Sequence, residues 1–330
     1  MAPVRYVLKY QADAWKAAFR GGGFPRFKNR RGDDSITLPS GTVHIRCGKL
    51  HFPRIGPMVL RRRGGNPYPT GKPLQVIVKR CLGKWYATVT YAVELPEPAD
   101  NGEALGLDRN VAQVATSSGE FYRTPHVARL EARRKRYQRM MARRVKGSKR
   151  RALARHRAAK TARSIAGIRK NWQHQTSCSL AEAAGTIVIE RLNVQGMTRS
   201  AKGTVEEPGK NVRQKAGLNR SLLSVNQKTG RVAVGWSGLA RNLGYKAARV
   251  IEVNPAYTSQ TCAECGHIAP ENRRSQSEFR CVSCGHTANA DTNAAINILA
   301  SGTRAAGRGE ATALAASAIR QQIGEARSFL

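Results

Sequence analysis

The spacing of apolar residues divides the first hundred positions into a short helix and a set of strands. Over residues 1–23, Leu8, Ala12 and Trp15 recur every three or four positions, a helical period that ends at three consecutive glycines. From residue 24 to 101 the pattern changes to short alternating runs of apolar and polar residues, separated by turn residues. We therefore expect a helix followed by a small antiparallel β-domain, closed into a barrel.

Longer apolar runs occupy the middle of the chain. Residues 103–123 alternate around a Ser-Ser-Gly turn, which predicts a hairpin of a new sheet. Residues 186–189 form a continuous β-branched run, typical of a strand buried on both faces. A helical pattern at 236–247 and a strand pattern at 249–253 follow, whereas the polar, glycine-containing segment 195–232 predicts a mobile loop. The expected fold class is α+β, with an α/β domain after the β-domain.

Charge changes this picture most strongly at residues 127–170. The chain has 57 Lys and Arg against 21 Asp and Glu, a net charge of +36, and this stretch holds eighteen of the basic residues and one acid, Glu131. Two thin apolar stripes predict a helical hairpin with a strongly basic surface. Because like charges four residues apart destabilise an isolated helix, we expect a polyanionic partner, with nucleic acid as the first candidate.

The residues expected to contact nucleic acid lie on this hairpin and on the approach to the β-domain. They are Arg133, Arg134, Lys135, Arg136, Arg143, Arg144, Lys149, Arg150, Arg151, Arg26 and Lys28.

The cysteines predict a structural metal site. Cys262 and Cys265 form one Cys-x-x-Cys pair, Cys281 and Cys284 form a second, and fifteen residues separate the pairs. Four thiolates at this spacing can close a tetrahedral shell around Zn²⁺. The other three cysteines, Cys47, Cys81 and Cys178, are scattered, and we expect them to be buried free thiols in a reducing cytoplasm.

The sequence does not favour a membrane or secreted protein, nor an enzyme that acts on a small molecule. No run approaches the eighteen apolar residues of a membrane-spanning helix, and the first residues lack the apolar core of a signal peptide. No catalytic serine or cysteine arrangement and no phosphate-binding loop is present, so neither a membrane partner nor a small-molecule substrate is expected.

Three carboxylates stand at positions where acids are unusual or chemically useful. Asp108 lies inside a predicted strand, Glu190 directly follows the buried strand, and Asp291 opens a helix. Each has a plainer explanation: a strand-end hydrogen bonder, an ion-paired glutamate or a helix N-cap. A sheet like that of RNase H would bring the three together, and three acids can hold two Mg²⁺ ions, which prefer oxygen ligands and cleave phosphodiesters.

The motifs around these residues resemble the TnpB (OrfB) family of insertion-sequence proteins, relatives of the type V CRISPR nucleases. The matching segments are GLDRNVAQVA around Asp108, VIERLNV around Glu190 and ADTNAAINIL around Asp291, with NPAYTSQTCAECGH and CVSCGH between the last two. They look like the three RuvC motifs with a zinc ribbon inserted before the last. FPRFKNRRGDDS at 24–35 is similar to the start of the family's wedge domain.

This resemblance implies a transposon-encoded, RNA-guided DNA endonuclease. It would use catalytic Asp108, Glu190 and Asp291 with Mg²⁺, and structural Zn²⁺ in the ribbon. Its partners would be a guide RNA from the mobile element and a double-stranded DNA target, in a bacterial or archaeal cytoplasm at the nucleoid. In such systems base pairing reads the target sequence, while the protein reads a flanking motif and the backbone.

The resemblance also implies a domain order and one departure from the family pattern. Only about twenty residues precede the FPRFK segment, so we expect the first wedge strand and most of the helical recognition lobe to be missing. The expected domains are a recognition-lobe remnant at 1–23, a wedge-like β-barrel at 24–101, a RuvC-like nuclease domain at 102–254 containing hairpin 127–170, a zinc ribbon at 255–288, the last RuvC segment at 289–305, and a C-terminal tail at 306–330.

Two other functions are compatible with these residues. The chain could bind nucleic acid with little or no cleavage, because the N-terminal lobe is short. It could also be a transposase that joins DNA strands, because RNase H-like transposases use three acids too. The rim of the ribbon, with Arg273, Arg274 and Arg280, is a further candidate surface for nucleic acid.

Overall fold

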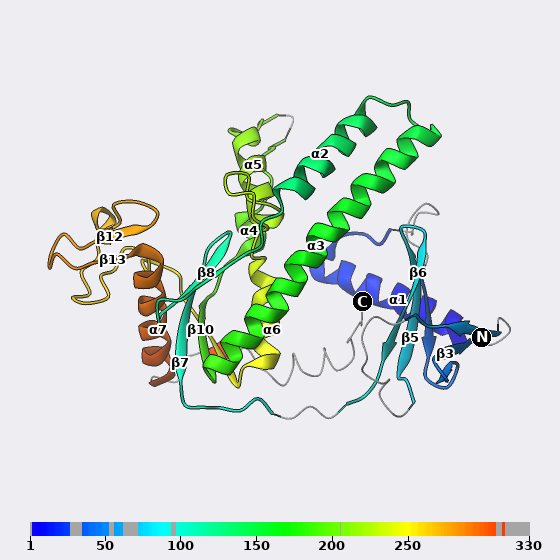
Figure 1. The fold of residues 1–330 in the computed structure, drawn as a ribbon, viewed down its shortest axis with the longest axis horizontal. Coiled ribbons are helices and arrows are strands. Elements are labelled where there is room, and N and C mark those ends of the chain that lie inside the picture. Colours follow the sequence, from blue (N-terminus) through cyan, green and yellow to red (C-terminus); the bar gives the residue numbers. More distant parts are fainter. Residues whose placement is uncertain are drawn as a thin grey trace. The chain divides into compact units, whose positions relative to one another are not determined.

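The computed structural model describes residues 2–26, 35–52, 56–61, 72–93, 97–204, 206–307 and 312–313. The chain divides into two compact units, and the division falls between residues 93 and 97. Figure 1 shows the elements in chain order.

The first unit contains one helix and two small antiparallel sheets. Helix α1 (Ala2–Ala17) continues into a π-helical turn, η1 (Ala18–Gly22), where the glycines predicted to end the helix lie. One sheet has the order β1-β5-β6, and the other has the order β2-β3-β4. The strands are β1 (Ser35–Pro39), β2 (His44–Arg46), β3 (Lys49–Phe52), β4 (Gly56–Val59), β5 (Gln75–Cys81) and β6 (Lys84–Thr90).

The core of this unit consists of apolar side chains that point inward from its strands. Leu38, Leu50 and Val76 are each about 1% exposed and cluster with Val43 and Val78. The described strands form two separate three-stranded sheets around this cluster, so the closure of a barrel stays a prediction.

The second unit is built on a six-stranded sheet with the order β14-β11-β10-β7-β8-β9. Strand β10 is parallel to both β7 and β11, and the remaining neighbours are antiparallel. The strands are β7 (Ala104–Arg109), β8 (Gln113–Thr116), β9 (Phe121–Arg123), β10 (Thr186–Glu190), β11 (Arg249–Val253) and β14 (Thr312–Ala313). The α+β class expected from the sequence is confirmed.

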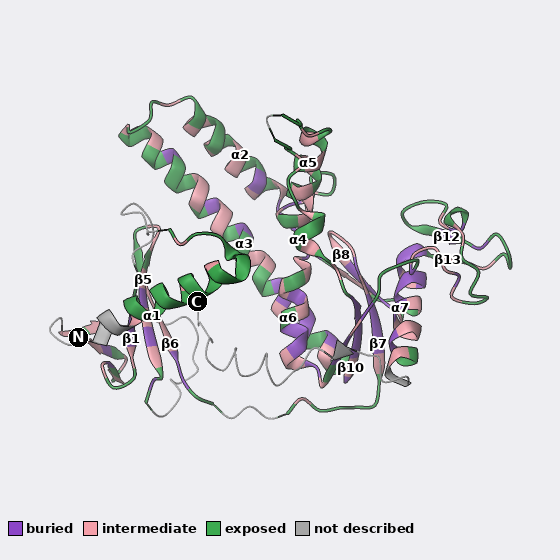
Figure 2. Cartoon of the chain, turned by 180° about the vertical axis from the view of Figure 1, so that it is seen from behind, coloured by how far each residue is buried: buried purple, intermediate pink, exposed green. Residues whose placement is uncertain are grey.

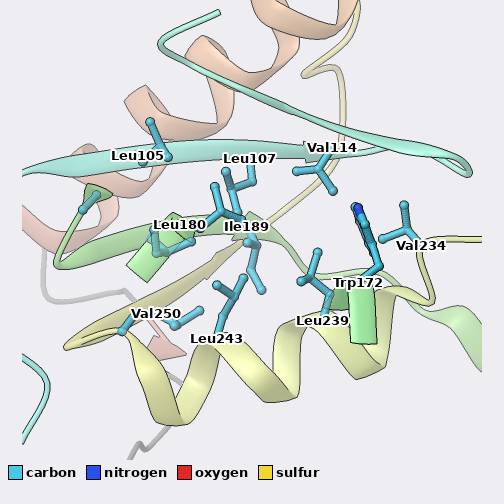
Figure 3. Packing of buried hydrophobic residues seen from close by; sticks show 13 residues of the cluster. Leu105, Leu107, Val114, Trp172, Leu180, Ile189, Val234, Leu239, Leu243 and Val250 are labelled. Atoms are coloured by element: carbon cyan, nitrogen blue, oxygen red, sulfur yellow. The ribbon is translucent and has the colours of Figure 1, made fainter. Parts of the chain in front are cut away.

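Strand β10 buries both of its faces, as its β-branched run predicts. Ile187 and Ile189 pack with Leu107 and with helix α6 (Trp236–Lys246), while Val188 packs with Ile298 of helix α7 (Ala290–Gly307). Figure 3 shows the first of these two cores. Side chains alternate between the two faces of a strand. The residues directly before and after Leu107 on β7 and Ile189 on β10 therefore face α7.

Helix α7 lies close to the sheet because two of the residues at their contact, Gly106 and Gly302, are glycines. A Cβ on Gly106 would come within 2.2 Å of the Ala295 carbonyl oxygen, and one on Gly302 would meet Val188 at 2.5 Å. A larger residue at either position would push α7 away from β7 and β10.

The basic segment forms the expected helical hairpin. Helix α2 (Ala128–Ala142) and helix α3 (Lys149–Ala183) pack along a thin apolar seam. Ser148 caps α3 by accepting a hydrogen bond from the Arg151 backbone N–H at 3.2 Å. Helix α3 extends thirteen residues beyond the expected end at 170 and joins the core under the sheet. Figure 2 contrasts the buried strands β7 and β10 with the more exposed hairpin.

The segment predicted as a mobile loop contains two helices. They are α4 (Val194–Met197) and α5 (Val212–Leu223). The expectation of a mobile loop at 195–232 was wrong there, because contacts with distant residues stabilise the helices. Asn219 of α5 donates to the Thr198 carbonyl at 2.8 Å, and Arg169 of α3 donates to the Leu223 carbonyl at 2.7 Å.

The segment predicted as a zinc ribbon, at 255–288, precedes helix α7. A 3₁₀ turn η2 (Pro270–Asn272) and strands β12 (Glu278–Arg280) and β13 (Thr287–Asn289) lead directly into α7. Strand β14 adds antiparallel to β11 at the sheet edge. Of the expected tail 306–330, residues 308–311 and 314–330 lie outside the described residues.

Candidate active site and metal centre

The three carboxylates predicted from the sequence lie near one another where α7 packs on the sheet, close enough for the charges of Glu190 and Asp291 to act on Asp108. Leu107 of β7 is paired with Ile189 of β10, so Asp108 and Glu190 follow at the same level of two parallel strands. Both lie on the face opposite Leu107 and Ile189, which is the face that α7 covers. Asp291 is the second residue of α7.

Burial and mutual repulsion dominate the electrostatics of this site. Burial raises the pKa of Asp108 from 3.8 to about 7, and the negative charges of Glu190 and Asp291 contribute to that rise, against the opposing charges of Arg273 and Arg109. Burial also raises the pKa of Glu190, opposed by the Thr258 hydroxyl and by Arg109. Asp108 thus experiences the charge of both other acids, which is the arrangement that a bound cation relieves.

Separate donors orient the first two carboxylates. The Asn110 side-chain amide donates to Asp108 at 3.2 Å. The Thr258 hydroxyl donates to Glu190 at 2.9 Å. Thr258 itself is 6% exposed, so this hydroxyl is fixed by its surroundings. Glu190 forms no ion pair among the described residues, which disfavours the plainer explanation of an ion-paired glutamate.

Asp291 is not the N-cap of α7. The Asn289 side chain accepts from the Asp291 and Thr292 backbone N–H groups at 3.0 and 3.4 Å and so takes that role. The Asp291 carboxylate instead accepts from the Gln113 amide at 2.9 Å through Oδ2. Its buried Oδ1 accepts no hydrogen bond, although the Arg273 guanidinium lies 3.5 Å away. A buried carboxylate oxygen without a hydrogen bond suits a metal ligand.

Two arginines at the site were not predicted from the sequence in these roles. Arg109 is 4% exposed and donates to the Glu190 and Trp236 backbone carbonyls, which ties β7 to β10 and to the start of α6. Arg273, a candidate for nucleic-acid contact at the ribbon rim, places its guanidinium 3.5 Å from Asp291. Only the position of Arg109, directly after Asp108 in a buried strand, could have drawn attention to it.

The four predicted cysteines form one compact cluster. The ligand atoms of Cys262, Cys265, Cys281 and Cys284 all lie within 4.8 Å of one another, and among the described residues no other group of three or more His, Cys, Asp or Glu is gathered as tightly. The Cys284 and Ser283 backbone N–H groups lower the pKa of Cys281 to about 6, which favours a thiolate. The cluster can hold a metal ion, and four sulfur ligands fit Zn²⁺.

Glycines and one aromatic residue shape this cluster. Gly266 and Gly285 have φ angles of 74° and 76°, which a tight knuckle after each Cys-x-x-Cys pair requires. Phe279 is fully buried beneath Cys262 and Cys281. Outside the cluster, the expectation of buried thiols was wrong, because Cys47 and Cys178 are exposed and Cys81 is half-buried.

The nine hairpin residues expected to contact nucleic acid fall into two groups. Five are exposed on the surface: Arg133, Arg136, Arg143, Lys149 and Arg150. Of these, Arg143 also donates weakly to the Arg139 carbonyl at 3.5 Å. Four are bonded within the chain: Arg134 to Glu131, Lys135 to Gln227, Arg144 to the Arg150 carbonyl, and Arg151 to the Met141 and Arg144 carbonyls. Arg26 is exposed, and Lys28 lies outside the described residues.

Within the described ranges, no helix combines the length and the apolar composition needed to cross a membrane.

Comparisons with known proteins assign two segments to families. Residues 88–201 match the OrfB_IS605 family, described as a probable transposase, and residues 236–298 match the Cas12f1-like TNB domain. Together the matches include the three carboxylates, the four clustered cysteines and the whole hairpin.

Relatives that align along most of the chain agree with these matches. The chain is 38% identical over 309 residues to the putative RNA-guided DNA endonuclease InsQ of Escherichia coli K12, covering 91% of this chain and 74% of InsQ. It is 27% identical over 320 residues to a putative RNA-guided DNA endonuclease of Streptomyces pristinaespiralis, covering 93% and 73%. Among solved structures, the Cas12f1–sgRNA–target DNA complex aligns with a TM-score of 0.43 at 18% identity, covering 84% of this chain and 62% of that one. The chain therefore belongs to the TnpB (OrfB) family.

Proposed function

We propose that the chain is a transposon-encoded, RNA-guided DNA endonuclease that hydrolyses phosphodiester bonds in the bacterial or archaeal cytoplasm. The observation that carries this proposal is the nearness of Asp108 to Glu190 and Asp291: burial and the charges of these two acids raise the pKa of Asp108 to about 7. InsQ and the Streptomyces relative, both described as putative RNA-guided DNA endonucleases, support the same activity.

The three carboxylates would hold two Mg²⁺ ions in a two-metal site. Hard cations prefer oxygen ligands, and the unbonded Oδ1 of Asp291 and the raised pKa of Asp108 both favour a cation there. When bound, Mg²⁺ would activate water and neutralise charge on the phosphate. The chain's own groups then orient the ligands: Asn110 holds Asp108, and Thr258 holds Glu190.

Arg273 would serve this site as a counter-charge. Its guanidinium, 3.5 Å from Asp291, can turn to a phosphate oxygen once a cation takes over the carboxylate. Arg109 is enclosed by backbone carbonyls, so we assign it to positioning rather than to contact with DNA.

Zn²⁺ in the ribbon would be structural, because four cysteines leave no open coordination position for chemistry. We assign the units of the chain accordingly: a recognition-lobe remnant at 1–23, a wedge-like domain at 24–101, the nuclease domain at 102–254 and 289–305, and the ribbon at 255–288. The guide RNA and the DNA target would be the polyanions that the basic hairpin 127–170 attracts.

The direct test is to express the chain together with the DNA that flanks its gene and to sequence any RNA that co-purifies. A discrete RNA from the element's end, followed by cleavage of a matching plasmid beside a fixed short motif, is the expected result. Heterogeneous RNA and an uncut plasmid would favour a nucleic-acid binder without useful cleavage, and joined DNA products would favour a transposase.

The exposed arginines of the hairpin should carry much of the affinity for nucleic acid. Replacing Arg136, Arg143 and Arg150 with Gln should weaken RNA binding and reduce the slope of log K against log salt by about 0.7–0.9 for each phosphate that the variant no longer neutralises. Fluorescence anisotropy over a range of salt concentrations measures both effects.

The matched control is Arg134→Gln. Because Arg134 is committed to Glu131 within the chain, this change should lower the melting temperature and leave the salt slope unchanged. Equal slopes for the triple variant and the wild type would remove the hairpin from the nucleic-acid interface.

The fall of the cleavage rate on the acid side of the pH–rate profile should follow the protonation of Asp108. A cation binds its carboxylate form, so cleavage should fall as the pH drops below about 7, and higher Mg²⁺ should move the fall to lower pH. Since the charge of Arg273 lowers the pKa of Asp108, Arg273→Gln should move the fall to higher pH and slow cleavage about tenfold or more. Arg274→Gln, a change at an exposed neighbour, should do neither.

A further inference from the structure

Tyr257 has a backbone conformation that its side chain disfavours. Its φ angle is +62°, in the left-handed region, which a bulky aromatic residue rarely adopts. The side chain is 64% exposed, so packing does not compensate for this conformation. An observed outlier of this kind next to reacting groups points to a function.

The turn around Tyr257 explains how the conformation is maintained but not why a tyrosine stands there. The Tyr257 carbonyl accepts from the Gln260 and Thr261 backbone N–H groups at 2.9 and 3.0 Å, and from the Thr261 hydroxyl at 2.8 Å. Asn254 closes the preceding turn by accepting from the Ala256 N–H at 3.0 Å. Glycine or asparagine would meet these backbone demands at lower cost.

The turn that contains Tyr257 is directly connected to a residue of the acidic site. The next residue, Thr258, is buried and donates its hydroxyl to Glu190 at 2.9 Å. The Thr258 carbonyl accepts from Asn297 of α7 at 3.0 Å. Thr258 is thus fixed to both β10 and α7, and its exposed neighbour Tyr257 is one residue away from a group that contacts Glu190.

We propose that Tyr257 is a positioning residue that stacks against a nucleobase of the DNA strand being cut. This inference rests on the proposed nuclease function. Every base has a π-face, so stacking holds a strand without regard to sequence, as an enzyme that leaves sequence recognition to an RNA guide requires. The basic surface of the chain supplies attraction to the backbone, while the ring fixes the depth at which the strand lies.

Three variants separate stacking from folding. Tyr257→Gly removes the ring and relieves the left-handed strain, so the melting temperature should stay equal or rise while binding of a single-stranded oligonucleotide weakens about tenfold. Tyr257→Phe keeps the ring and should bind as the wild type does. Ile268→Ala removes a 53% exposed apolar side chain from the same ribbon and is the matched control.

Binding is measured with the full chain and its co-purified RNA, in an Asp108→Asn background that prevents cutting. The probe is a single-stranded DNA carrying one abasic position, moved along the strand. At one or two adjacent positions, removal of the base should weaken binding by the chain that retains Tyr257 about tenfold and have no effect on the Tyr257→Gly chain. The salt slope should not change, because the number of neutralised phosphates stays the same.

Two results would overturn the proposal: equal affinity of the Gly variant, or losses of affinity from the abasic position and from Tyr257→Gly that simply add. A melting temperature that falls in the Gly variant would assign Tyr257 to folding instead. If the native chain neither binds nor cuts DNA, the proposed nuclease function fails with it. If the native chain cuts and the Gly variant cuts equally well, only the stacking role fails.

Discussion

Asp108→Asn should abolish DNA cleavage and at the same time raise the thermal stability of the metal-free chain. The folded chain holds the pKa of Asp108 at about 7, against 3.8 for an ordinary aspartate. The protonated folded form is therefore favoured at low pH, and the stability it contributes is lost as the pH rises from about 4 through 7. At pH 8 the charged carboxylate opposes folding by up to ~4 kcal/mol, since one pKa unit corresponds to ~1.4 kcal/mol.

Asparagine has the same shape without the charge, so it should remove this cost. In EDTA at pH 8, the melting temperature of the variant should exceed that of the wild type by about 3 °C or more. At pH 4 the two should melt together, because the charge on Asp108 then makes little difference between the folded and unfolded chains. Adding Mg²⁺ should stabilise the wild type and not the variant, by mass action on the folded state. The rate of cleavage should fall at least ~10³-fold.

Scanning calorimetry at the two pH values checks the stability, and a plasmid assay checks the cleavage. Glu278→Gln, which neutralises an exposed acid on the ribbon, is the control and should change neither. A variant that melts below the wild type at pH 8 would show that Asp108 is held by favourable partners, and undiminished cutting would remove it from the catalytic site.

The elements that could be predicted from the sequence are those in which the local order of apolar and polar residues indicates which side chains are buried. The β-branched run at 186–189 became the central strand because only a strand buried on both faces tolerates so apolar a run without alternation. The basic hairpin was visible because its apolar seam recurs at helical spacing. The cysteine spacing located the four-cysteine cluster directly, since a set of four metal ligands itself dictates the spacing.

What could not be predicted depends on contacts between distant segments. Nothing near Arg273 in the sequence shows that its side chain pairs with Asp291, because the ribbon fold creates that contact. The division of the hairpin arginines into exposed and internally bonded groups depends on which helix face meets a carbonyl or an acid. Composition alone concealed α5, whose order comes from its contacts with Arg169 and Thr198.

Disrupting the cysteine cluster should inactivate the nuclease without altering any carboxylate. The ribbon and the acidic site share one framework: Asn293 of α7 accepts from the Ala263 N–H at 3.0 Å and donates to the Thr261 carbonyl at 2.8 Å. Arg273, carried by the ribbon, pairs with Asp291, and the turn before the ribbon carries Thr258, which orients Glu190. Metal binding supplies the free energy that folds so small a module, ~10–16 kcal/mol in zinc-finger peptides.

In Cys265→Ser we therefore expect bound zinc to fall from one ion per chain to near zero and cleavage to fall at least ~10²-fold, while the sheet stays folded. Elemental analysis, calorimetry and the plasmid assay measure the three quantities. Cys178→Ser, at an exposed thiol outside the cluster, should retain zinc and activity. Any residual cleavage should show its fall at higher pH, because displacing Arg273 removes a charge that lowers the pKa of Asp108. A zinc-free chain that cuts at the native rate, with an unshifted pH profile, would mean that the acids keep their arrangement without the ribbon.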